Sequence, residues 1–123
     1  MISLSRESFQ RLIQQALEDL PEEFASRLEN VALVVEEEPD AKVLEQMGFD
    51  PEEAADELFG LYQGTPLVER DTGYADVPDR IVIYMGPILR SCRSPREVVR
   101  EIRNTVIHEI GHHFGLSDEE MPY

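Results

Sequence analysis

The sequence lacks most of the residues that build disulfide-bonded, secreted or membrane-spanning proteins. Cys92 is its one cysteine, which excludes an internal disulfide framework and a zinc site made of paired cysteines. No apolar run approaches the roughly 20 residues that cross a bilayer. The first ten residues show no basic region followed by an apolar stretch, so they do not predict a secretory signal. We therefore expect a cytoplasmic protein with no membrane partner.

Positive charge is scarce as well. Eleven Lys and Arg stand against 26 Asp and Glu, which gives a formal net charge of −15. Nucleic acids are bound chiefly by Lys and Arg that neutralise phosphates, so this balance argues against a nucleic-acid partner. One stretch is locally basic, with five arginines: Arg90, Arg93, Arg96, Arg100 and Arg103. We interpret it as a solvated helix face with ion pairs, and a phosphate- or carboxylate-binding patch is the alternative.

The residues that are present predict a single α+β domain over residues 1–123. Apolar residues from Phe9 to Leu20 recur every three or four positions, which is typical of an amphipathic helix, and Ser5 suits its N-cap. A short helix is expected after Pro21. Apolar, β-branched runs at 31–35 and 81–85 predict buried strands, the second ending at Gly86-Pro87. The expected fold is a small mixed sheet packed with helices.

Two segments between these strands are less regular. Residues 36–57 hold ten acidic residues and one lysine, and Asp50-Pro51 is a good helix start, so we expect a solvated helical insertion. Residues 61–68 predict a strand pair or a bent edge strand. Such a segment either forms an ordinary hairpin or binds a peptide by strand addition.

The last helix is predicted over residues 94–115. Ser94 suits the N-cap, Pro95 the first helical position and Glu97 a capping box, while Gly115 suits the helix end. Its apolar residues share one broad face, which should lie against the core: Val98, Val99, Ile102, Val106 and Ile110.

This helix carries all three histidines in the spacing H-E-x-x-H. Residues four apart lie one turn apart on a helix, so His108 and His112 can reach one zinc ion. Glu109 lies on the same side and is placed to accept a proton from water at the metal. His113 points about 140° away from His108, and we expect a hydrogen-bonded core histidine there. The plainer interpretation of His108 and His112 is two surface histidines.

A third metal ligand is available just beyond the helix. The sequence continues to H-E-x-x-H-x-x-G-x-x-D, in which Gly115 permits the turn that brings Asp118 back toward the ion. An unremarkable surface acid at this position, with Glu119 or water completing the site, is the alternative.

Residues 108–118, HEIGHHFGLSD, match the elongated zinc motif of metzincin-type metallopeptidases in the version with aspartate as third ligand. Nearly the whole chain, including residues 30–32, 60–64 and 78–81, resembles the small bacterial zincin-like metallopeptidase family, often described as minimal zincins. The resemblance implies a compact zincin-like fold with zinc on His108, His112 and Asp118 and with Glu109 as general base. It also implies hydrolysis of peptide bonds in a peptide or protein substrate.

One departure from the metzincin pattern leaves other functions open. Metzincins continue into a subdomain with a methionine-containing turn beneath the metal, whereas five residues follow Asp118 here. We expect that wall of the cleft to be missing, or to be supplied by other segments or another subunit. A zinc-binding adaptor with a vestigial site is therefore the alternative function, and a metal-dependent ribonuclease is opposed by the net charge. Tyr62, Tyr74 and Tyr84 are candidates to stabilise an oxyanion.

Overall fold

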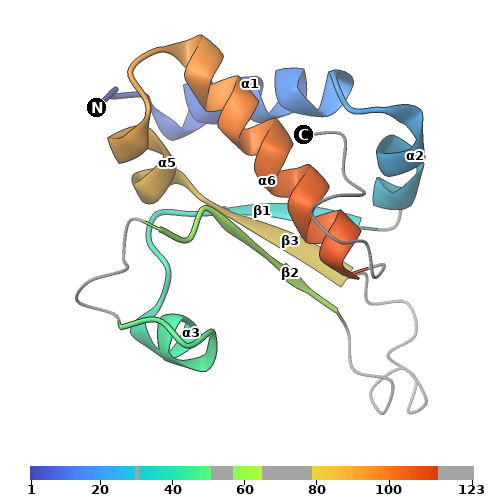
Figure 1. Cartoon of the computed structure of the whole chain (residues 1–123). Helices are drawn as coiled ribbons and strands as arrows, with labels where there is room; N and C mark the ends of the chain where they lie inside the picture. Colours follow the sequence, from blue (N-terminus) through green and yellow to red (C-terminus); the bar gives the residue numbers. More distant parts are fainter. Residues whose placement is uncertain (30, 51–56, 65–78, 114–123) are drawn as a thin grey trace.

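A three-stranded mixed sheet organises the fold (Figure 1). The computed structural model describes residues 1–29, 31–50, 57–64 and 79–113. Strand β3 (Asp79–Tyr84) lies between β1 (Val31–Glu36) and β2 (Gly60–Gln63). It runs parallel to β1, with Val31 opposite Asp79, and antiparallel to β2, with Tyr62 opposite Ile81. The mixed sheet and the α+β class agree with the sequence-based expectation.

Each face of β3 is buried by a different set of residues, because successive side chains of a strand point to opposite faces. Ile81 and Ile83 belong to the main core beneath the long helices. Val82 and Tyr84 pack on the other face, in a smaller cluster with Leu44 of helix α3 (Ala41–Gln46). A strand covered on both sides has a continuous apolar sequence rather than an alternating one, which explains the run at 81–85.

Helices α1 (Arg6–Glu18), α5 (Met85–Ser91) and α6 (Pro95–His113) lie together on one side of the sheet (Figure 1). Ser5 caps α1 by accepting a hydrogen bond from the Ser8 amide, as its sequence predicts. Shorter helical turns, α2 (Glu22–Ala25) and η1 (Ser26–Leu28), follow α1 and lead to β1. No helix among the described residues is long and apolar enough to cross a membrane.

Helix α6 is held at its start by the predicted cap and along its length by the core. The Ser94 hydroxyl accepts a hydrogen bond from the Glu97 amide at 3.2 Å. The Glu97 carboxylate accepts one in return from the amide of Arg93, one residue before the cap, at 2.5 Å. Seven residues of α6 are buried: Val98, Val99, Ile102, Val106, Ile107, Ile110 and Gly111. This long buried face fixes the helix that carries the histidine motif.

Three local expectations need correction or lie outside the described residues. The strand expected over 81–85 ends at Tyr84, and Gly86-Pro87 lies in the first turn of α5, where proline is tolerated. The Gly86 amide donates to the carbonyl of Glu37 at 2.8 Å, and a Cβ at Gly86 would lie 2.7 Å from that oxygen. Strand β2 pairs with β3 and ends at Gln63, and residues 65–68 are not described. The helix expected from Asp50-Pro51 falls on residues 51–56, which are also not described.

Candidate active site

The last two turns of α6 bring His108, Glu109 and His112 to one side of the helix. The imidazole centroids of His108 and His112 are 6.1 Å apart, and the ring planes are inclined by 34°. Two imidazoles that share one tetrahedral zinc through bonds of about 2.0–2.1 Å have centroids roughly 5 Å apart, so small side-chain rotations bring both rings onto one ion. His108 is half-buried and His112 is exposed, which leaves the pair open to solvent on one side.

Glu109 is oriented by the edge of the sheet. Its Oε1 accepts a hydrogen bond from the backbone amide of Tyr62 on β2, at 3.0 Å. Burial raises the pKa of the Glu109 carboxyl, while the Tyr62 amide and the two neighbouring histidines act in the opposite direction. A carboxyl group with a raised pKa next to two imidazoles is the kind of group that serves as a general acid or base near neutral pH.

The Tyr62 amide is available to Glu109 because of the register between β2 and β3. The amide of Tyr84 donates to the carbonyl of Phe59, so the alternation of an antiparallel ladder directs the backbone groups of Leu61 and Gln63 toward β3. The backbone groups of Gly60 and Tyr62 then face away from β3, toward the edge that is open among the described residues, and the Tyr62 amide there meets Glu109 of α6, which lies over one face of the sheet (Figure 1). Sequence reasoning missed this contact, since the donor is a main-chain atom and leaves no residue signature.

The Tyr62 side chain connects the end of α6 to the sheet. Its hydroxyl donates to Oδ2 of Asp79, at 2.8 Å. Its ring stacks on that of His113, with centroids 3.9 Å apart and planes inclined by 19°. The expectation of a core position for His113 is therefore wrong: this residue is exposed, because the last turn of α6 extends beyond the apolar core to the end of β2.

The three tyrosines named as oxyanion stabilisers have different positions. The Tyr62 hydroxyl donates to Asp79. Tyr84 is 1% exposed and packs with Leu44, on the sheet face opposite α6. The sheet thus separates Tyr84 from the histidines, and it is not a candidate. Tyr74 lies outside the described residues.

The structure thus brings together three of the four residues that the sequence nominates. Asp118 lies outside the described residues, so its place as third ligand stays a prediction. Among the residues that the structure describes, no group of three or more His, Cys, Asp or Glu could hold a metal ion. Two imidazoles one turn apart nevertheless fit zinc, which favours nitrogen ligands and needs one or two further donors.

Comparison with known proteins decides the family. A family model described as zincin-like metallopeptidase matches residues 28–123. The chain belongs to this family. Its match spans the sheet, α6 and the whole H-E-x-x-H-x-x-G-x-x-D motif, whereas α1 and α2 precede it. Membership implies a metal cofactor, typically zinc, and agrees with the α+β architecture. No curated protein matches the chain.

Proposed function

We propose that this protein is a zinc-dependent metallopeptidase. The observation that carries the proposal is the pairing of Glu109 with the Tyr62 amide, which aims a half-buried carboxylate along the same helix side as His108 and His112. A merely solvated glutamate needs no such backbone donor. Family membership supports the same assignment.

In this proposal His108 and His112 hold zinc through their imidazole nitrogens, and Asp118 completes the ligand set. Zinc at this position supplies a Lewis acid that polarises the scissile carbonyl and lowers the pKa of a water molecule toward about 7. The adjacent Tyr62–His113 stack holds the last helical turn, which carries His112, against β2.

Glu109 acts as general base and then as general acid. Its Oε1 is engaged by the Tyr62 amide, so Oε2 takes the proton from the attacking water. The same oxygen then donates this proton to the leaving amine, which completes the cleavage of the peptide bond. Burial raises the pKa of Glu109 and so makes its carboxylate a stronger base for taking the proton from water.

A peptide or protein chain is the proposed substrate, with no nucleic acid or membrane involved and with the cytoplasm as location.

The hydrogen bond between the Tyr62 amide and Glu109 restricts how a peptide could add as a strand along β2. The Tyr62 amide faces the open edge but already donates to Glu109. A peptide that paired with Tyr62 through this amide would displace the general base, so the substrate must lie outside that hydrogen bond.

The test combines metal analysis with cleavage of a diverse fluorogenic peptide library. We expect cleavage that a chelator abolishes and added zinc restores. Glu109→Gln keeps the size of the side chain and removes its basicity, so zinc content should stay unchanged while hydrolysis falls by about 10²–10⁴-fold. Glu101→Gln, a change of another partly buried acid on α6, is the matched control and should leave hydrolysis unchanged.

Three outcomes would contradict this assignment. Loss of zinc from Glu109→Gln would make Glu109 a ligand or a structural residue. Undiminished cleavage by that variant would mean that another base, or a contaminating peptidase, is responsible. Zinc binding without cleavage of any peptide would favour the adaptor function over the peptidase.

A further inference from the structure

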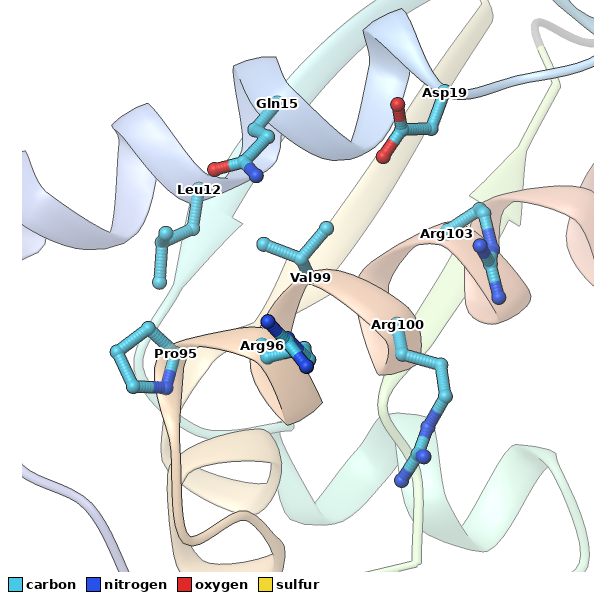
Figure 2. Close-up of a pocket in the computed structure, with 8 residues that line it drawn as sticks. All are labelled: Leu12, Gln15, Asp19, Pro95, Arg96, Val99, Arg100 and Arg103. Carbon is cyan, nitrogen blue, oxygen red and sulfur yellow. The ribbon is translucent and has the colours of Figure 1, made fainter.

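A hollow lies between α1 and the first half of α6, away from the histidines. Its volume is about 470 Å³, and Figure 2 shows Leu12 of α1 and Val99 of α6 directed into the space between the helices, with Arg100 and Arg103 extending away from α1 at its rim. Helix α1 contributes Leu12, Gln15 and Asp19, and α6 contributes Pro95, Arg96, Val99, Arg100 and Arg103. The volume lies in the range of about 300–1,000 Å³ that is typical of small-molecule sites.

The charge of this hollow is opposite to that of the whole chain. Three arginines and one aspartate line it, in a protein of net charge −15. The arginines stand at positions i, i+4 and i+7 of α6, so they form one stripe along the helix. A hollow lined by positive charge produces a local positive electrostatic potential, which attracts anions to this small region of an otherwise acidic protein.

Two of these arginines are weakly engaged within the described part of the chain. Arg96 is exposed and has no ion pair there. Arg100 approaches Glu101 with 3.9 Å between Nε and Oε1, and its side chain is 56% exposed. An exposed pair at this distance contributes little, about 0–1 kcal/mol. Both guanidinium groups can therefore bind an oxyanion without breaking a strong interaction.

The lining also has an apolar part. Leu12 is half-buried, Val99 is 8% exposed, and Pro95 adds its ring beside them. Arginine binds phosphate and carboxylate oxygens through two parallel N–H groups, which suits the head of an anionic ligand. The apolar residues suit a non-polar body attached to that head.

We propose that this hollow binds a small organic anion, with a phosphate or carboxylate head on Arg96 and Arg100 and an apolar body on Leu12 and Val99. The site is separate from the candidate active site. Arg100 precedes His108 by eight residues, which is about 12 Å along the helix axis. We therefore expect binding to be independent of the metal and of peptide cleavage.

The test is a titration of the full chain, ¹⁵N-labelled, followed by amide chemical shifts. Phenyl phosphate and benzoate each combine an anionic head with an apolar ring. Inorganic phosphate has the anionic head alone, and phenol has the ring without the anionic head. We expect saturable shifts in α1 and the first half of α6, with one of the first two probes binding more tightly than either half-ligand. The comparison of phenyl phosphate with benzoate identifies the preferred head. Zinc-loaded and chelator-treated protein should bind these probes with equal affinity. A failure of the anion-site proposal is therefore distinguishable from a failure of the peptidase proposal.

Charge variants make the expectation specific. Arg96→Gln and Arg100→Gln should each weaken phenyl phosphate binding by about three- to tenfold. Arg93→Gln removes the same charge from an exposed residue outside the hollow and should leave binding unchanged. Asp19→Asn removes the one acidic residue of the lining and should tighten binding.

The proposal is overturned by any of several results. Absence of saturable shifts in α1 and α6 would mean that no site exists. If Arg93→Gln weakened phenyl phosphate binding as much as Arg96→Gln and Arg100→Gln do, the anion would be held only by the general positive charge of this region and not by a defined site. Phenol binding as tightly as phenyl phosphate would make the hollow an apolar site rather than an anion site.

Discussion

Replacement of Gly60 by alanine tests the contact between β2 and α6 most directly. A Cβ at Gly60 would lie 2.6 Å from Cγ2 of Thr105 on α6 and 2.9 Å from the carbonyl oxygen of Val82 on β3. Favourable carbon–carbon contacts need about 3.5–4.0 Å, so the first contact is roughly 1 Å too short. The Val82 carbonyl belongs to the central strand and cannot retreat. Strand β2 must therefore move relative to α6, or Thr105 must change its rotamer.

We expect Gly60→Ala to lower the free energy of unfolding by about 1–3 kcal/mol, as overpacking of a close contact does. The same movement would separate the Tyr62 amide from Glu109, so peptide cleavage should fall while zinc stays bound to the histidines of α6. Urea denaturation followed by far-UV circular dichroism measures the stability, and the cleavage assay measures the second effect.

Gly64→Ala is the matched control at the other end of the same segment. A Cβ there would meet its nearest heavy atoms, in Asp79 and His113, at 3.6–3.9 Å, which is ordinary contact. Its effect on stability should stay within about 0.5 kcal/mol. A Gly60→Ala protein as stable as the parent, or a Gly64→Ala protein equally destabilised, would refute the argument that close approach of α6 fixes β2.

Two further predictions concern the metal and the core. Asp118→Ala should weaken zinc binding in a competition titration far more than Glu119→Ala does, because only Asp118 follows Gly115 by three residues. Equal losses of zinc affinity in the two variants would mean that the wrong acid is assigned as the third ligand. Cys92 is 1% exposed, and burial, with Glu101 and Glu97 adding to it, raises the pKa of its thiol. Since the thiolate is the reactive form, alkylation of Cys92 at mildly alkaline pH should be slow in the native protein and fast in urea, and fast native labelling would show that this part of the core opens.

Local sequence patterns predicted the elements that depend on nearby residues. The Ser5 and Ser94 caps, the apolar face of α6 and the apolar run of β3 all act within a few residues of one another, and the structure contains each of them. The spacing of His108, Glu109 and His112 is likewise a property of one helix. These features need no knowledge of the rest of the fold.

Contacts between distant segments could not be predicted in this way. The hydrogen bond from Tyr62 to Glu109 joins residues 47 positions apart and uses a backbone donor. The helical period places His113 on the apolar side of α6, but the core ends one turn earlier and the ring stacks on Tyr62 instead. The start of α5 at Met85 was missed because Gly86 and Pro87 are typical turn residues. Asp118 remains a prediction from spacing.

The packing of α1 against α6 also determines the order in which the molecule can fold during synthesis. Phe9, Ile13 and Ala16 of α1 belong to the same core as Val106 and Ile110 of α6. Helix α1 leaves the ribosome before α6, so its apolar face lacks the α6 side of this core until the later helix has emerged. The two helices then meet by closing a long loop, which slows folding relative to local contacts. The apolar face of α1 therefore stays uncovered by α6 until α6 has emerged, and a transiently exposed apolar surface of this kind favours aggregation.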